Sequence, residues 1–147
     1  MGYRMGMARR DASALFGDEH VRQYRETGGE YGHDWKEGTS TLLLTTTGRR
    51  SGEPRTTPLI YGRKGDDYLI VASKGGADEP PAWYLNLQAD PNAEIQVKAD
   101  RFKVTARDAN DDEKPEMWKT MTAEWPQYDE YQEKTDRQIP VVVLSRS

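Results

Sequence analysis

Residues 42–59 read LLLTTTGRRSGEPRTTPL, and this stretch decides how the chain folds. Apolar and β-branched residues lead into a turn bounded by Gly48 and Gly52, and a second β-rich run begins at Arg55. This pattern predicts two antiparallel strands joined by a short turn. The turn also concentrates guanidinium groups, hydroxyls and backbone N–H groups, which together suit an anionic ligand. We therefore expect a hairpin whose turn binds an anion, although a plain surface hairpin is the alternative.

The rest of the chain continues the strand pattern with short connections. We expect six strands, over residues 39–46, 55–61, 68–73, 93–99, 101–106 and 139–144. Short helices are expected over residues 18–27, 81–87, 110–124 and 127–135. Because strands and helices do not alternate regularly, an antiparallel barrel with helical decoration fits better than a doubly wound parallel sheet.

Length and composition indicate one small domain. The chain has 147 residues, and hydrophobic residues make up 35% of them, so Tyr and Trp must supply much of the buried surface. Residues 1–16 lack periodicity and are expected to be a flexible N-terminal segment before a single domain over residues 17–147. No apolar run approaches the roughly 18 residues of a membrane span, so we expect no stable membrane insertion.

The residue types that usually carry catalysis or bind metal are scarce. The chain has no cysteine, which excludes disulfides and thiolate chemistry and is typical of a cytoplasmic protein. Its two histidines, His20 and His33, follow no metal-ligand spacing, so we expect surface side chains and no metal site.

Charge is distributed unevenly along the chain. The net charge is −4, yet residues 48–64 carry five cations against one acid, whereas residues 107–137 are rich in acids. A local cationic patch on an acidic protein favours a discrete anion over nucleic acid. The turn is not a Walker loop, because no Lys-Ser/Thr pair follows Gly52, and a strand rather than a helix follows, unlike a dinucleotide fingerprint.

Several ordered motifs resemble those of a known family. They are TTTGRRSG at 45–52, PRTTPL at 54–59, VASKGG at 71–76, PAWYLNL at 81–87 and RQIPV at 137–141. Together they resemble the deazaflavin-dependent nitroreductases, small actinobacterial reductases that use coenzyme F-420, and the likeness spans residues 39–146. The resemblance implies a fold that is α+β and mainly β: an antiparallel split β-barrel, like that of FMN-binding proteins, decorated by short helices.

The resemblance also implies a binding site for coenzyme F-420, which combines a deazaflavin ring, a phosphodiester and an oligoglutamate tail. The phosphate would meet the turn residues Gly48, Arg49, Arg50, Ser51 and Gly52, with Arg55 and Lys74 on phosphate or tail carboxylates. The ring would be flanked by Thr57, Pro58, Leu59, Ala72 and Ser73, and the pocket closed by Trp83, Tyr84, Asn86 and Leu87. Arg63 and Lys64 would extend the cationic stripe toward the tail.

A hydride-carrying coenzyme leaves the protein to supply binding, orientation and electrostatics. A proton must still reach the reduced substrate, from water or from Ser73, Tyr128 or Tyr131 as candidate catalytic residues. The three-residue spacing of Trp125, Tyr128 and Tyr131 predicts one helical face, which is either a core stripe or a wall against a planar substrate. With Trp83, these three are the expected substrate-binding residues.

These observations predict a cytoplasmic reductase that passes hydride from reduced coenzyme F-420 to a planar conjugated acceptor, such as a quinone, an activated enone or a nitroaromatic. An FMN-dependent split-barrel oxidoreductase and a non-catalytic coenzyme carrier are the alternatives. The expected partner is a small-molecule acceptor without nucleic acid, and the chain is expected to be a monomer or a homodimer.

Overall fold

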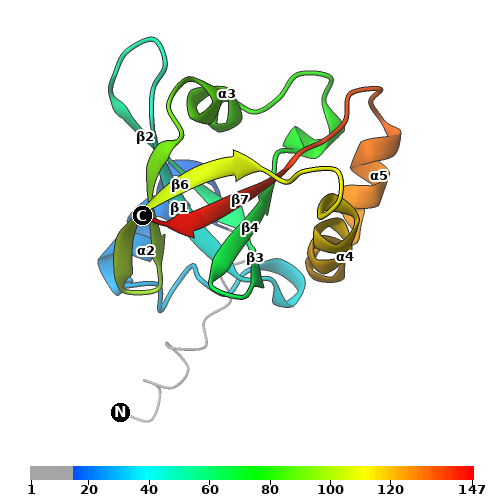
Figure 1. Ribbon diagram of the computed structural model, residues 1–147. Coiled ribbons are helices and arrows are strands. Elements are labelled where there is room, and N and C mark those ends of the chain that lie inside the picture. The colour runs from blue at the N-terminus through cyan, green and yellow to red at the C-terminus, as the bar shows by residue number, and fades with distance from the viewer. Residues whose placement is uncertain (1–14) are drawn as a thin grey trace.

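The structure, a computed structural model, describes residues 15–147, so residues 1–14 of the predicted N-terminal segment lie outside it. Within the described part, seven strands form one sheet in the order β2-β1-β5-β6-β7-β4-β3 (Figure 1). Their bounds are β1 (Thr41–Thr47), β2 (Pro54–Ile60), β3 (Gly62–Lys64), β4 (Asp67–Val71), β5 (Asn92–Val97), β6 (Asp100–Asp108) and β7 (Val141–Arg146). Neighbouring strands pair antiparallel, and β2 also contacts β4, so the sheet curls until its two ends approach each other.

The predicted antiparallel barrel is therefore confirmed, with one strand that the sequence analysis missed. The missed strand, β3, spans only Gly62–Lys64 and pairs with β4 through Gly62 opposite Leu69. Three residues that include two cations carry no detectable alternation, so only the adjoining turn at Gly65 was recognised.

The register of β1 and β2 determines which side chains point into the barrel. Leu42 lies opposite Leu59, and Leu44 lies opposite Thr57. Residues directly opposite each other share one face of a sheet. Leu42 and Leu44 belong to the barrel cluster, and Leu59 packs against it. The buried members of this cluster are Leu42, Leu44, Tyr68, Ile70, Ala72, Trp83, Leu87, Ile95, Val104, Val142 and Leu144.

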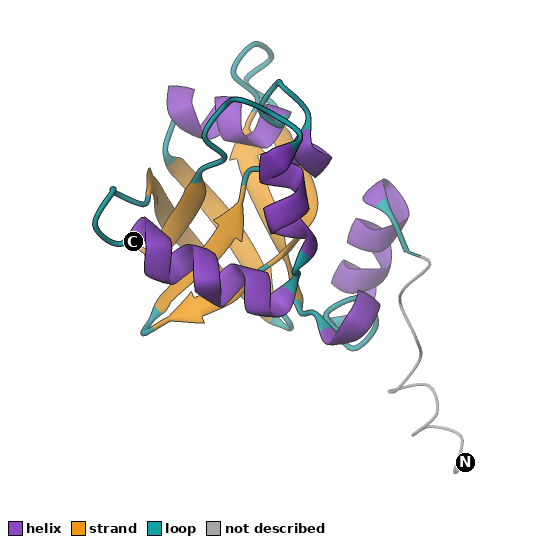
Figure 2. Ribbon diagram, turned by 90° about the vertical axis from the view of Figure 1, so that its right-hand side faces the viewer, coloured by secondary structure: helices purple, strands orange, loops and turns teal. Residues whose placement is uncertain are grey.

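A second buried cluster lies on the other face of β4 and β7, under α4 (Lys114–Glu124) and α5 (Gln127–Glu133). Figure 2 shows both helices lying against the sheet on this side. We call this second cluster the helix-side cluster. Its buried members are Leu69, Val71, Met117, Met121, Tyr128, Ile139, Val141 and Val143. Because β4 and β7 are covered on both faces, their sequences read as continuous apolar runs rather than as alternating ones.

Two further helices flank the other end of the sheet order. Helix α2 (Gly17–Thr27) packs on β2, and α3 (Ala82–Ala89) lies beside the β1–β2 turn (Figure 1). The Tyr24 hydroxyl anchors α2, because it donates to the Thr41 carbonyl over 2.9 Å and accepts from the Lys98 N–H over 2.8 Å. Two short 3-10 turns, η1 (Lys36–Gly38) and η2 (Lys74–Gly76), complete the described elements.

Both histidines are buried, so the prediction of surface side chains is wrong. His20 is 2% exposed, and its Nε2 lies 2.8 Å from the Gly32 carbonyl, to which it donates. His33 is 7% exposed and lies between two polar partners, with Nδ1 2.8 Å from Asp34 Oδ1 and Nε2 2.8 Å from the Tyr61 hydroxyl. The sequence around His33 does not reveal a partner such as Tyr61, which lies 28 residues further along the chain, between β2 and β3.

Residues 15–147 contain no helix that is both long enough and apolar enough to cross a membrane. In the same range, no group of three or more His, Cys, Asp or Glu side chains is arranged to hold a metal ion.

Candidate coenzyme site

The turn between β1 and β2 is closed by backbone hydrogen bonds. The Gly48 N–H donates to the Glu53 carbonyl, and the Gly52 N–H donates to the Gly48 carbonyl, both over 2.8 Å. A Cβ on Gly48 would lie 2.7 Å from Ser51 Oγ, and Gly52 has φ +73°, a left-handed conformation that favours glycine. The two glycines that bound the turn in the sequence therefore also set its shape.

Ser51 is oriented by its neighbours in the same turn. Its Oγ accepts the Glu53 N–H over 3.1 Å and an Arg55 Nη2–H over 3.4 Å. A hydroxyl oxygen accepts two hydrogen bonds and donates one, so the Ser51 O–H is left to donate to an anion.

Asn86 ties this turn to α3. Its Oδ1 accepts from the Arg49 backbone N–H over 3.1 Å and from Arg49 Nη1 over 3.0 Å, while its Nδ2 donates to Thr46 Oγ1 over 3.1 Å. Asn86 is 4% exposed, so its side-chain amide is largely shielded from water. The Asn86 amide thus fixes the position of the Arg49 guanidinium relative to the end of β1.

A cavity of about 270 Å³ lies between the turn, the start of β2 and the first part of α3. Its lining consists of Gly48, Arg49, Arg50, Ser51, Arg55, Thr57, Ala82, Trp83 and Asn86. Three of these nine residues are arginines and none is acidic. A ligand in this cavity would meet guanidinium forks and a hydroxyl beside an indole ring, which suits an anionic group joined to a flat ring.

The three predicted ring-flanking residues of β2 are placed differently from one another. Thr57 lines the cavity, and Leu59 lies further along the same inward face, packed against the barrel cluster. Pro58 lies between them, and side chains alternate along a strand, so it belongs to the opposite face.

Residues that follow β4 form the loop that we call the 72–77 loop. Ala72 and Ser73 are buried at 0% and 7% exposure, whereas Lys74 is exposed. Ala72 belongs to the same barrel cluster as Trp83, so the loop begins at the barrel interior. Ser73 and Lys74 are not among the nine residues that line the cavity.

The α3 residues divide between the cavity, the core and the surface. Trp83 lines the cavity and is 7% exposed, and Leu87 is buried in the barrel cluster. The Tyr84 hydroxyl instead donates to Asp108 Oδ2 on β6 over 2.7 Å. Burial, together with the Asp108 carboxylate, raises the pKa of Tyr84. The structure therefore directs Tyr84 toward β6 rather than into the cavity.

Arg63 and Lys64, which were predicted to extend the cationic stripe toward the tail, do not line the cavity with the arginines of the turn. These two residues lie on β3, beyond the far end of β2, which at seven residues is about 20 Å long. The Arg63 guanidinium lies 4.0 Å from the centroid of the Tyr68 ring. Proximity in sequence does not place them beside the turn, because an extended strand carries its two ends far apart.

Trp125, Tyr128 and Tyr131 do not share a helix, so the prediction of one helical face is wrong. Trp125 caps the end of α4, and Pro126 separates it from α5, which carries both tyrosines. The three still meet, because Trp125 Nε1 donates to the Tyr131 hydroxyl over 3.3 Å and the two tyrosine rings lie 6.1 Å apart. Tyr128 is buried in the helix-side cluster, with the other two at its edge, and burial raises its pKa.

Those three residues and Trp83 therefore belong to different clusters, on opposite faces of β4 and β7. Ala82 also lines the cavity, although it was not among the predicted site residues. Ala82 lies four residues before Asn86 on α3, and this i, i+4 spacing could have identified it.

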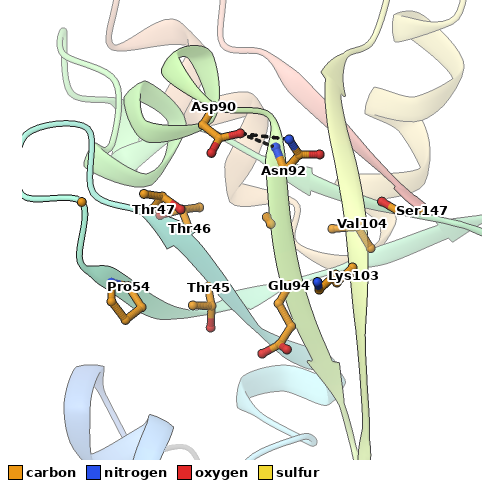
Figure 3. A pocket seen from close by; sticks show the side chains of 12 residues that line it. Thr45, Thr46, Thr47, Pro54, Asp90, Asn92, Glu94, Lys103, Val104 and Ser147 are labelled. Atoms are coloured by element: carbon orange, nitrogen blue, oxygen red, sulfur yellow. Dashed lines mark hydrogen bonds between the residues drawn. The ribbon is translucent and has the colours of Figure 1, made fainter.

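A second cavity, of about 520 Å³, lies between the end of β1, the start of β2 and strands β5 and β6 (Figure 3). Gly52, predicted as a coenzyme residue, lines this cavity instead of the first. The charged residues that line this second cavity are of both signs, namely Asp90, Glu94 and Lys103. Glu94 on β5 lies opposite Lys103 on β6, and the Asp90 carboxylate accepts hydrogen bonds from Asn92. The second cavity has no arginine, so the smaller cavity is the better site for a phosphate.

Comparison with known proteins gives consistent results. The model of the family described as "F-420H(2)-dependent quinone reductase" matches residues 17–146. An F-420H(2)-dependent quinone reductase of Mycobacterium tuberculosis strain H37Rv is 46% identical over 130 residues, which cover 86% of this chain and 87% of that protein.

Solved structures agree with these sequence matches. The structure of an F-420-H2 dependent reductase is 40% identical, with a TM-score of 0.67 over 71% of this chain and 93% of that one. A structure described as a domain-swapped dimer has the same TM-score and identity and covers 71% of this chain and 79% of that one. The predicted split-barrel fold is thereby confirmed.

Proposed function

Because the chain belongs to the F-420H(2)-dependent quinone reductase family, we propose that it is an enzyme that reduces a planar conjugated acceptor with hydride from reduced coenzyme F-420. The observation that carries the proposal is the cavity lined by Arg49, Arg50 and Arg55, with no acid among its lining residues. Quinones are the proposed acceptor class, with activated enones and nitroaromatics as further members of the same chemical type.

The donors around the cavity fit the anionic part of this coenzyme. Three guanidinium groups and the Ser51 hydroxyl match a phosphodiester, and charge-assisted hydrogen bonds of this kind are stronger than neutral ones. Asn86 holds Arg49 in place before any ligand arrives, which lowers the ordering cost of binding. Lys74 is proposed to meet phosphate or tail carboxylates from the 72–77 loop.

The remaining predicted coenzyme residues are proposed to surround the ring. Trp83 offers a flat apolar face at the cavity, and Thr57 adds a hydroxyl on the inward side of β2. Leu59, Ala72 and Leu87 belong to or pack against the barrel cluster behind them, so their proposed part is apolar support.

When bound, the reduced deazaflavin supplies the hydride, and a quinone needs one further proton to become a hydroquinone. Among the proposed proton donors, Tyr131 is half-buried and its hydroxyl accepts from Trp125, whereas Tyr128 is only 6% exposed. We therefore propose Tyr131 ahead of Tyr128, with Ser73 and water as the other sources. Trp125 and Tyr131 together would form the aromatic side of the acceptor site.

One titration tests the proposal. Oxidised coenzyme F-420 is added to the protein and its fluorescence is followed, with FMN as the competing coenzyme, and turnover is then measured on a panel of quinones, enones and nitroaromatics. We expect micromolar or tighter binding of the deazaflavin and quinone-dependent oxidation of its reduced form. Tight FMN binding with none of the deazaflavin would identify a flavin enzyme, and binding without turnover would identify a coenzyme carrier.

The proposal also covers the oligomeric state of the protein and its location in the cell. A related chain is a domain-swapped dimer, so a homodimer is the assembly proposed here, with a monomer as the alternative that light scattering after size exclusion would reveal. The proposed location is the cytoplasm, because proteins there rarely contain disulfides and this chain has no cysteine to form one. Cell fractionation checks this location.

A further inference from the structure

Arg137 lies in the segment between α5 and β7, and its guanidinium is devoted to the 72–77 loop. Nε donates to the Ala77 carbonyl over 2.9 Å, and Nη2 donates to the carbonyls of Ser73 over 2.9 Å and Ala72 over 3.2 Å. One side chain thus contacts the loop at its start and at its end. None of the salt bridges among residues 15–147 involves Arg137, so in the described structure its charge serves these carbonyls.

The loop that Arg137 holds has an unfavourable backbone conformation. Lys74 has φ +47°, and Gly75 and Gly76 follow with φ +63° and +87°. A residue with a Cβ avoids this region, and it remains there only when its surroundings impose it. Ser73 in a right-handed conformation followed by left-handed Lys74 also turns successive N–H groups toward one side, which is how backbone binds anions.

The same loop is fastened to α5, the element that carries the proposed acceptor residues. A Cβ on Gly76 would lie 2.8 Å from the Tyr131 carbonyl, so the loop and the helix are in close contact. Thr135 Oγ1 donates to Asp78 Oδ1 over 2.9 Å just beyond the loop. Gln132 Nε2 donates to the Arg137 carbonyl over 2.7 Å, which holds the Arg137 backbone to α5.

We propose that Arg137 is a positioning residue that sets the 72–77 loop against α5, so that Ser73 and Lys74 on the coenzyme side and Tyr131 on the acceptor side are placed as one unit. This inference rests on the proposed function, since it assumes that the loop adjoins bound coenzyme. The physical basis of the proposal is that one planar guanidinium donates to the carbonyls of Ala72, Ser73 and Ala77 at the same time. A Lys ammonium is a compact charge and does not reproduce this spread of donors.

The test measures coenzyme Kd by fluorescence titration, and kcat and KM for a quinone, in wild type, Arg137→Gln, Arg137→Lys and Arg137→Ala. We expect Arg137→Gln to raise the coenzyme Kd and lower kcat by at least tenfold each, with Arg137→Lys in between. For Arg137→Ala, millimolar guanidinium ion should restore part of kcat, because the ion can re-occupy the vacated position. A general loss of folding would not be repaired by a denaturant cation at that concentration.

Two further variants make the result specific. Gly76→Ala forces the loop away from Tyr131 without touching Arg137, and it should reproduce the loss of affinity and turnover. Arg101→Gln removes an exposed arginine paired with Glu94 and should leave both constants unchanged. All assays are run below the measured Tm of each variant.

The outcomes separate this inference from the proposed function. If wild type neither binds the deazaflavin nor turns over, the proposed function fails. If wild type is active and Arg137→Gln retains wild-type Kd and kcat, the positioning role of Arg137 is overturned. Should Arg137→Gln not fold, the folded Arg137→Lys variant decides in the same assays, and unchanged constants there also overturn it.

Discussion

At the scale of single residues, the proposed coenzyme site depends on which arginines share a cavity rather than on how many the sequence contains. Arg49, Arg50 and Arg55 line one cavity, and Asn86 holds Arg49 through both its backbone and its side chain. Arg63 belongs to the same run in sequence, yet it lies over Tyr68 at the other end of β2. A count of charges along the sequence therefore groups arginines that the fold separates.

The first prediction follows from that division. Arg49→Ala combined with Arg50→Ala should weaken coenzyme binding at least tenfold, about 1.4 kcal/mol, because two phosphate donors are lost. The matched control is Arg63→Ala with Lys64→Ala, which removes two cations from the same sequence run but not from the cavity. Fluorescence titration measures both, and equal affinities for the two double variants would contradict the phosphate assignment.

At the scale of elements, the β1–β2 turn and α5 carry the residues proposed to contact coenzyme and acceptor. The β1–β2 turn could be predicted because its conformation depends on residues adjacent in sequence. The positions of Gly48 and Gly52 predicted the hairpin correctly. The aromatic triplet was misread because Pro126 breaks the helical path that the spacing of Trp125 and Tyr131 implied.

The second prediction concerns the turn. Gly48→Ala should weaken coenzyme binding several-fold, because the added Cβ would lie 2.7 Å from Ser51 Oγ and 3.1 Å from the Glu53 carbonyl. Gly65→Ala is the control, since it has φ +60° in open space and should cost stability without touching the site. Comparing Tm and coenzyme Kd for both variants checks this, and a normal Kd in Gly48→Ala would refute it.

The third prediction concerns α5. Tyr131→Phe should lower kcat for a quinone while coenzyme Kd changes less than twofold, because the hydroxyl lost is a proposed proton donor on the acceptor side. Tyr128→Phe should have a smaller effect, since that side chain is 6% exposed within the helix-side cluster. Steady-state kinetics over a range of pH decides, and a larger loss for Tyr128→Phe would reverse the order proposed here.

At the scale of the whole molecule, stability is linked to pH through groups that folding moves away from their ordinary pKa values. Burial of the His20 imidazole lowers its pKa from 6.5, with the hydrogen bond to Gly32 opposing that shift. A hydrogen bond from Arg107 holds the pKa of Glu113 at about 2, with the Asn110 N–H adding to it. In both cases the unfolded chain binds the proton more readily, so stability falls as pH falls.

The fourth prediction separates these two contributions by their pH windows. The His20 contribution is complete above pH 6.5 and is lost as the pH falls below it, so His20→Gln should flatten the decline of Tm between pH 7 and pH 5. The Glu113 contribution is complete above pH 4.5 and is lost toward pH 2, so Glu113→Gln should alter only that lower range. Tm from circular dichroism at each pH gives both slopes, and each variant serves as the control for the other.

The sequence by itself determined six of the seven described strands, the hairpin turn and, through the family that its motifs resemble, the class of coenzyme. Alternation, turn glycines and ordered motifs are properties of residues close together in the chain, so they can be read without coordinates. The missed strand β3 falls where such local signals are weakest.

Only the tertiary structure decided which of those residues act together. His33 is buried because Tyr61 comes to it from 28 residues away, and Arg137 holds Ser73 from 64 residues away. The curl of the antiparallel sheet creates these contacts, because it brings β2 next to β4 and places the segment before β7 beside the end of β4. A contact between distant segments depends on that curl, and no pattern within either segment encodes it.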